Sequence, residues 1–300
     1  MGWFGFALIA AVLMGMGAVG EKQMAGKYIP TTSAMIGWLG VMLVVFGSVF
    51  AYLFPFESGT PVRYIAAIFG SGFVYSFSLF ILYRALQTGE ASRIYPIYNM
   101  APIFVAIMAV FFLGEVLRGW QWVAILVTVA GAVLISAERN AGGKGVRLGG
   151  TLLALTVAAI LAAVGQTLAG YGLEEVSPYT AFWAQRFGAF AIVVFIFRKQ
   201  TFKEMAVVFK NPIGLGVILL TEAIIMPVGH VFFLEAFKRG QVALVATVFA
   251  TTPLWVFVFS SILSLPKIGI MDERLNRSAL VQKSMAVVLV VIGIIGINLL

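Results

Sequence analysis

Residues 213–237 read Ile-Gly-Leu-Gly-Val-Ile-Leu-Leu-Thr-Glu-Ala-Ile-Ile-Met-Pro-Val-Gly-His-Val-Phe-Phe-Leu-Glu-Ala-Phe. The run is long and apolar enough to cross a bilayer as a helix, which takes about 20 residues. It nevertheless carries Glu222 and His230 in its interior. Ionisable side chains inside membrane helices are rare and usually have a functional role. The stretch therefore predicts a membrane protein and, at the same time, a candidate site.

The composition of the whole chain agrees with a membrane location. The 300 residues are 61% hydrophobic and 11% charged, whereas soluble domains carry about 25% charged residues. The mean hydropathy is +1.03. A water-soluble fold could not cover so much apolar surface, so we predict an all-α membrane protein.

Ten apolar runs qualify as transmembrane helices. They are residues 3–20, 31–54, 63–83, 91–113, 119–136, 149–170, 178–197, 213–237, 241–263 and 283–300. The runs are continuously apolar and too long for the tilted strands of a membrane barrel. We interpret the first run as a retained helix and not a cleaved signal, because no charged segment precedes it.

The two halves of the sequence resemble each other. The segment 85–89 is followed by Pro102, and the segment 236–240 is followed at the same spacing by Pro253. We therefore predict two five-helix repeats, residues 1–139 and 149–300, joined by a linker at 140–148. An odd number of spans inverts the second repeat in the membrane. Inverted repeats are typical of secondary transporters, which bind their substrate in a central cavity between the repeats.

The distribution of positive charge predicts the orientation. Connections after odd-numbered helices carry fifteen Lys and Arg residues, and connections after even-numbered helices carry four. Cytoplasmic loops are enriched in these residues, so both termini are predicted outside. We expect the plasma (inner) membrane of a bacterium or archaeon. The net charge of +8 then reflects basic cytoplasmic loops and not binding to nucleic acid.

Several function classes are disfavoured by composition. The chain has no cysteine and one histidine, so we expect no metal site and no cofactor. The glycine-rich segment 142–145 lacks the spacing of a phosphate-binding loop. A membrane enzyme would need acidic or histidine clusters that are missing here, so we predict that the protein is not an enzyme.

At this point the chain resembles the EamA branch of the drug/metabolite transporter superfamily. An alanine and a glycine precede the fourth helix, a proline lies within it, a Gly-Glu pair closes it, and a glycine follows in the fifth. These positions are Ala85, Gly89, Pro102, Gly114, Glu115 and Gly131, with Ala236, Gly240, Pro253 and Gly293 in the second half and Ser177, Pro178, Arg186 and Phe187 at the seventh helix.

The resemblance covers nearly the whole chain and implies an exporter of amino acids, nucleosides or other small metabolites. Two departures indicate unequal halves. The second half lacks the Gly-Glu pair and has a longer polar loop, residues 267–283, and the second helix has Trp38 where the seventh has Arg186. The family alone does not fix the substrate.

A polar stripe follows the fourth helix. Tyr95, Tyr98, Asn99 and Pro102 are spaced i, i+3, i+4 and i+7 and therefore share one face. We predict that the three polar residues bind substrate. The alternative is that they join helices together, since a polar side chain in lipid must find partners.

The eighth helix carries Glu222, a candidate for substrate binding and for proton coupling, because a buried carboxyl group can carry a proton. His230 is a further candidate ligand of the substrate. The alternative for both is a hydrogen-bonded packing role.

Further binding candidates are Arg186, Gln166 and Tyr75. The guanidinium of Arg186 could bind a substrate carboxylate, pair with Glu222 or reach a lipid headgroup. Three prolines, Pro102, Pro227 and Pro253, are predicted to bend their helices, because proline frees a backbone carbonyl.

The leading hypothesis is a secondary transporter that exports or exchanges small metabolites, most simply amino acids, by alternating access. Its partners would be the small-molecule substrate, the bilayer and, as a candidate coupling ion, protons. The alternative is a channel or facilitator for small polar solutes, which would need rings of polar residues around a pore. The oligomeric state is not predicted.

Overall fold

The computed structural model describes the chain apart from residues 89–90, 137–147, 197–198, 265–276 and 300. The first half contains α1 (Trp3–Gln23), the π-helical turn η1 (Met24–Tyr28), α2 (Thr32–Leu53), α3 (Val62–Thr88), α4 (Ala91–Tyr98), α5 (Ala101–Phe112) and α6 (Gly119–Ser136). The second half contains α7 (Leu148–Gly172), α8 (Pro178–Ile196), α9 (Lys199–Ala206), the 3-10 turn η2 (Val207–Lys210), α10 (Pro212–Ile218), the π-helical segment η3 (Leu219–Ile225), α11 (Met226–Arg239), α12 (Val242–Phe249), α13 (Thr252–Leu263) and α14 (Arg277–Leu299).

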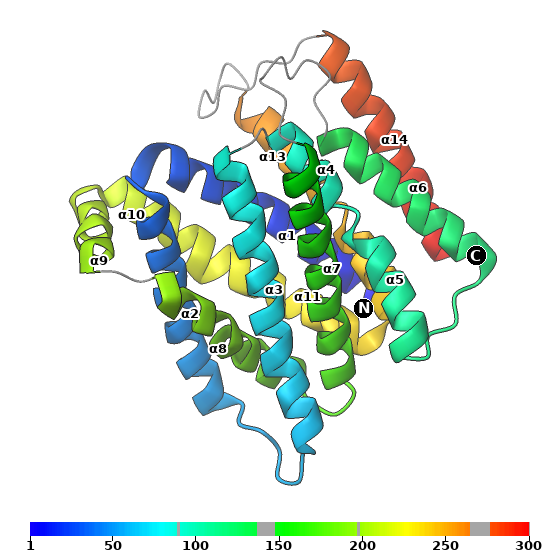
Figure 1. The fold of residues 1–300 in the computed structure, drawn as a ribbon, viewed down its shortest axis with the longest axis horizontal. Helices are drawn as coiled ribbons and strands as arrows, with labels where there is room; N and C mark the ends of the chain where they lie inside the picture. The colour runs from blue at the N-terminus through cyan, green and yellow to red at the C-terminus, as the bar shows by residue number, and fades with distance from the viewer. Residues whose placement is uncertain (89–90, 137–147, 197–198, 265–276, 300) are drawn as a thin grey trace.

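The predicted all-α membrane fold is confirmed (Figure 1). Within the described residues, eight helical stretches are long and apolar enough to span a bilayer, and α14 adds a shorter apolar helix, Val281–Ile297. The helix α8, which carries Gln185 and Arg186, is not one of the eight. Helices nevertheless occupy all ten predicted ranges.

Two ranges predicted as continuous helices are broken in the middle. The fourth divides into α4 and α5 at Asn99, and the ninth divides into α12 and α13 at Thr251. Pro102 and Pro253 lie in the first turn of the second piece in each case. Proline is accommodated there because the first-turn N–H has no partner within the helix. The two breaks are therefore equivalent features of the two halves.

Two other boundaries differ from the prediction. The first helix does not end at residue 20, because its backbone continues through Gln23 and then η1; a hydropathy reading stops at the first charged side chains, whereas the helix does not. The eighth helix contains η3, which holds Glu222 and leads to Pro227 in the first turn of α11. Single π-helical turns are often found at functional sites.

The first helix of each half packs against the other half. The first helix of the first half, α1, packs along α11, and the first helix of the second half, α7, packs along α3. Equivalent helices also pair, α2 with α8 and α6 with α14 (Figure 1). Two related halves would produce this arrangement. The proposed linker, residues 140–148, lies outside the described residues except for Leu148, where α7 begins.

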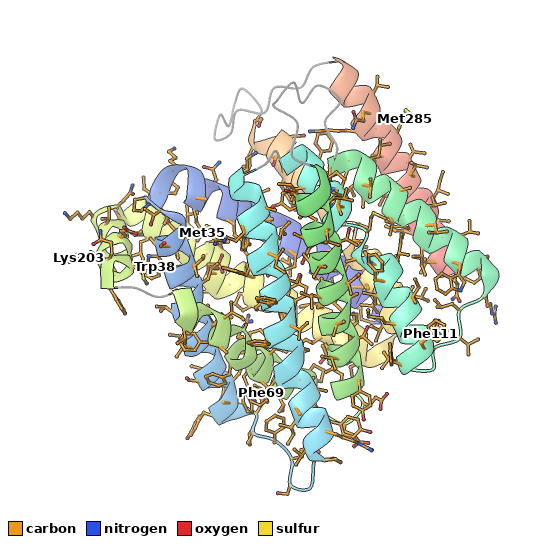
Figure 2. All side chains as sticks on the ribbon, viewed as in Figure 1. Met35, Trp38, Phe69, Phe111, Lys203 and Met285 are labelled. Carbon is orange, nitrogen blue, oxygen red and sulfur yellow. The ribbon has the colours of Figure 1, made fainter. Side chains whose placement is uncertain are left out.

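Glycines allow α6 and α14 to pack closely. A Cβ atom on Gly131 would come within 2.7 Å of the Val290 side chain, and one on Gly293 would collide with Thr128. Close approach of small residues is a main source of attraction between helices in lipid. On the outside, large apolar side chains such as Phe111 (79% exposed) and Met285 (59% exposed) project from the bundle (Figure 2), as a lipid-facing surface requires.

The Gly-Glu pair joins the two halves at one end. Gly114 has a positive φ of 68°, which favours glycine, and it turns the chain after α5. Both carboxylate oxygens of Glu115 then accept hydrogen bonds from the backbone N–H groups of Val242 and Ala243, at the start of α12. Partial burial raises the pKa of Glu115, and these two donors counteract the rise. A residue of the first half thus caps a helix of the second.

Candidate functional site

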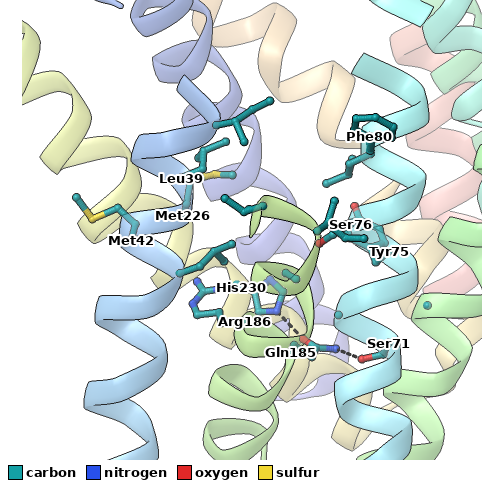
Figure 3. Close-up of a pocket in the computed structure, with 18 of the residues that line it drawn as sticks. Leu39, Met42, Ser71, Tyr75, Ser76, Phe80, Gln185, Arg186, Met226 and His230 are labelled. Carbon is teal, nitrogen blue, oxygen red and sulfur yellow. Dashed lines mark hydrogen bonds between the residues drawn. The ribbon is translucent and has the colours of Figure 1, made fainter. Parts of the chain in front are cut away.

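A cavity of about 420 Å³ lies within the bundle and is lined by residues of both halves. The first half contributes α1, α2 and α3, and the second contributes α7, α8, η3 and α11, with Phe249 at the end of α12. Figure 3 shows Tyr75 and Ser76 on one side of this space and His230 and Arg186 on another. The cavity is large enough for a small metabolite.

Five of the residues predicted from the sequence to bind substrate line this cavity. They come from five different elements: Tyr75 from α3, Gln166 from α7, Arg186 from α8, Glu222 from η3 and His230 from α11. Residues that lie up to 155 positions apart in the sequence thus line one cavity.

The polar stripe of the fourth helix, Tyr95, Tyr98 and Asn99, does not line the cavity. Tyr95 is 37% exposed, the hydroxyl of Tyr98 bonds that of Ser78 at 3.0 Å, and Asn99 donates to the hydroxyl of Ser136 at 2.8 Å. None of the three predicted residues is among those that line the cavity. The structure places Tyr98 and Asn99 at contacts of the broken helix with α3 and α6. Tyr98 also bonds Tyr75, which lines the cavity, so this part of the stripe lies directly behind the cavity wall.

A chain of hydrogen bonds crosses the wall of the cavity. The Nε2 atom of His230 bonds the side-chain oxygen of Gln185 at 2.8 Å, and the amide nitrogen of Gln185 donates to the Ser71 hydroxyl at 2.8 Å (Figure 3). The chain connects α11, α8 and α3. The backbones of α3 and α8 approach closely here, since a Cβ on Gly72 would collide with the carbonyl of Gln185.

Arg186 occupies a position next to this chain. Its guanidinium carbon lies 3.7 Å from the ring centroid of Phe182, which is fully buried. Stacking on an aromatic ring stabilises a cation that is removed from water. The Nε atom of Arg186 is buried and has no hydrogen-bond partner among the described residues. The group therefore retains an unused donor at the cavity.

Two acceptors are also unused. The side-chain oxygen of Gln166 and the Oε1 atom of Glu222 are buried and make no hydrogen bond to the described part of the chain. Both residues are at least nine-tenths buried, with exposed fractions of 9% and 6%. A buried polar atom without a partner costs about 1–3 kcal/mol, so a polar ligand or water that supplied one would bind favourably.

The sequence interpretation missed other polar lining residues. Glu21 at the end of α1 and Arg84 near the end of α3 both line the cavity, as do Gln185 and Ser71. Glu21 could have been found from the helix period, which continues past the predicted end at residue 20. No local signal marked Gln185, because only tertiary packing directs it towards the cavity.

The cavity is lined by equal numbers of basic and acidic side chains. Among the described lining residues there are two guanidinium groups, Arg84 and Arg186, and two carboxyl groups, Glu21 and Glu222. Glu222 interacts electrostatically with Glu21 and with Arg186. The described residues contain no cluster of three or more potential metal ligands. The cavity thus suits a ligand that carries both signs of charge.

Comparisons with known proteins agree with the architecture. Residues 1–137 match the EamA-like transporter family. The chain is 29% identical over 136 residues to a Sinorhizobium protein described as an uncharacterized transporter in the cobO 3′ region, and the match covers 45% of this chain and 96% of that protein. It is 26% identical over 126 residues to the uncharacterized transporter YxxF of Bacillus subtilis (strain 168), with 42% of this chain and 40% of that protein covered.

A solved structure shares the fold over almost the whole chain. A crystal structure described only as that of a protein superposes with a TM-score of 0.69 at 14% sequence identity, and the match covers 98% of this chain and 96% of the other. At this identity the likeness concerns the fold alone.

Proposed function

We propose that the protein, whose residues 1–137 match the EamA-like transporter family, is a membrane transporter of the drug/metabolite transporter type. Its substrates are small zwitterionic metabolites, above all amino acids, which it exports or exchanges. It would work as a secondary transporter by alternating access, with both halves moving around the central cavity. The positive charge of the odd-numbered connections supports a plasma-membrane orientation with both termini outside.

The observation that carries the proposal is the pair of unused, oppositely charged groups in one cavity. Arg186 has a free donor and Glu222 has a free acceptor, both buried. A guanidinium binds a carboxylate well, and a carboxylate binds an ammonium group by the same charge-assisted hydrogen bonding. An amino acid presents both groups, so it could satisfy both sites without leaving a net charge in the cavity.

Glu222 is also our candidate for proton coupling. It lies in η3, inside an apolar helix and facing the cavity, where a carboxyl group can exchange a proton only with the cavity contents. If the proton and the substrate ammonium compete for this carboxyl group, export of one would be coupled to entry of the other.

The test is counterflow in proteoliposomes preloaded with a mixed pool of amino acids, followed with labelled candidates one at a time. We expect saturable exchange that depends on the substrate. In Glu222→Gln we expect pH-driven transport to be lost and exchange to continue at a lower rate, because the amide oxygen still accepts a hydrogen bond from the substrate ammonium but no longer carries a charge. Glu57→Gln removes the same charge from an exposed loop and serves as the matched control.

Three results would contradict the proposal in different ways. The amino-acid assignment would be refuted if no amino acid exchanged. An ohmic current without saturation would favour a channel for small polar solutes. Unchanged pH-driven transport in Glu222→Gln would remove Glu222 as the proton site.

A further inference from the structure

The hydrogen-bond chain at the cavity wall has a direction, and Ser71 determines it. The Ser71 hydroxyl donates its one hydrogen to the backbone carbonyl of Ile68, at 2.7 Å. A hydroxyl has a single hydrogen and two lone pairs. Towards Gln185, which lies 2.8 Å away, Ser71 can therefore only accept.

The orientation of the Gln185 amide follows. Oxygen and nitrogen of a side-chain amide are assigned from the hydrogen bonds that they make. Since Ser71 accepts, the nitrogen of Gln185 must face Ser71, and the oxygen must face His230. Gln185 is 91% buried, as its exposed fraction is 9%, so water cannot readily replace either partner.

The oxygen of Gln185 can only accept, so the hydrogen of the 2.8 Å bond belongs to Nε2 of His230. In a neutral imidazole, one nitrogen is a donor and the other an acceptor. The remaining nitrogen, Nδ1, then carries a lone pair and has no hydrogen bond to the described residues. The ring lines the cavity, and its edges rest against Phe182 and Phe233.

We propose that Ser71 and Gln185 are positioning residues that hold His230 in the Nε2–H tautomer, so that Nδ1 accepts a hydrogen bond from a donor group of the substrate, namely its ammonium group. The inference rests on the proposed function and specifies which end of the substrate meets α11. A carboxylate at this point would face the lone pair of Nδ1 and would be repelled, whereas Arg186, next to Gln185 in the chain, supplies donors for it.

Other charged groups share the space with His230. Arg186 from α8, Arg84 from α3, Glu222 from η3 and Glu21 from α1 line the same cavity. Arg186 interacts electrostatically with both Glu222 and His230, so the donor for the substrate carboxylate lies beside the acceptors for its ammonium group, as an α-amino acid requires. The tautomer of His230 therefore adds an uncharged acceptor for the ammonium group next to the guanidinium that is proposed to bind the carboxylate.

The sequence allows a direct measurement, because His230 is the only histidine in the chain. We would express the full-length protein with ¹⁵N-labelled histidine and a histidine-free affinity tag, and record the two imidazole nitrogen resonances in detergent or bilayers. We expect one protonated nitrogen, Nε2, and one unprotonated nitrogen, Nδ1. A protonated Nδ1, in either the other tautomer or the imidazolium, would overturn the proposal.

Two serine variants test the positioning role. Ser71→Ala leaves His230 and Gln185 unchanged and allows the Gln185 amide to turn over, so we expect a second set of resonances from the Nδ1–H tautomer. Ser78→Ala removes another buried hydroxyl of α3, which bonds Tyr98 instead, and we expect the wild-type spectrum. An unchanged spectrum in Ser71→Ala would show that Ser71 does not determine the tautomer.

Transport measurements test whether Nδ1 of His230 accepts a hydrogen bond from the substrate. Asparagine can place its oxygen near the position of Nδ1, so His230→Asn should retain more exchange than His230→Leu, by about tenfold or more. The analogue of the best substrate that lacks its amino group should lose more than this factor in wild type, because it also loses its bond to Glu222. His230→Leu should then lower the exchange of this analogue much less than it lowers that of the best substrate. Equal exchange in both His230 variants would refute the acceptor role. If no amino acid exchanges at all, the proposed function fails, and the nitrogen spectrum still decides the tautomer.

Discussion

The fourth and the eighth membrane helices look alike in sequence and differ in what surrounds them. Both are apolar runs interrupted by polar residues and a proline, and both are irregular in the structure, at Asn99 in one and at η3 in the other. In the fourth helix, Tyr98 and Asn99 bond hydroxyls on adjacent helices. In the eighth helix, Glu222 lines the cavity with a carboxylate oxygen that lacks a partner among the described residues.

The difference shows that a polar stripe in a membrane helix does not by itself identify a binding site. Polar side chains must be satisfied in lipid, and neighbouring helices can provide the partners. A site is indicated where buried polar atoms remain unsatisfied around a cavity. The following predictions test this distinction, from the largest expected effect to the smallest.

The largest effect is expected at the cavity. Arg186→Met removes the free donor and the positive charge while it keeps much of the side-chain volume. We expect exchange to fall about tenfold to a hundredfold, because a hydrogen bond to a charged group contributes about 1.5–3 kcal/mol. Initial rates of labelled amino-acid exchange would measure the loss.

The matched control is Lys203→Met, which removes an exposed positive charge on α9, at the edge of the molecule (Figure 2). It should leave the rate unchanged. If Arg186→Met exchanged at the wild-type rate, the cavity would not be the substrate site and the comparison with the fourth helix would lose its basis.

A smaller effect, on stability, is expected at Glu115, where the two halves meet. Glu115→Gln leaves one oxygen to serve the N–H groups of Val242 and Ala243, and it removes a negative charge from the start of α12. We expect a loss of about 1 kcal/mol in unfolding free energy, measured by denaturant titration in micelles. Glu57→Gln is the control, and equal stability of the two variants would contradict the capping role.

The sequence was sufficient for the fold and for part of the site. Hydropathy located ten helices, because a span in lipid must be continuously apolar, and Glu222 stood out in such a run. Glu21 was missed because its helix continues beyond the apolar residues. The position of Gln185 depends on the close contact between α3 and α8 at Gly72. The opposite fates of Asn99 and Glu222 depend on whether a neighbouring helix presents a hydroxyl, which no local pattern reports.

A third prediction concerns the bond between Asn99 and Ser136. A double-mutant cycle of Asn99→Leu and Ser136→Ala should give a coupling energy of about 0.6 kcal/mol, the usual value for hydrogen bonds between membrane helices. Neither variant should change the substrate concentration at half-maximal exchange. A large change in that concentration, with stability unaffected, would return Asn99 to the substrate site.

The smallest effect is expected at Tyr98, which bonds Ser78 of α3 at 3.0 Å. Tyr98→Phe removes only the hydroxyl, and Ser78 can turn its hydrogen to a carbonyl of its own helix, so the loss of stability should stay below about 0.6 kcal/mol. The paired variant Tyr75→Phe removes the same bond between Tyr75 and Tyr98 from the other side, and it also removes a hydroxyl from the lining of the cavity. If Tyr98 only joins helices, Tyr75→Phe will alter exchange more than Tyr98→Phe does. The reverse order would mean that the substrate reaches the fourth helix, and that the hydroxyl partners of Tyr98 and Asn99 are exchanged for substrate groups during transport.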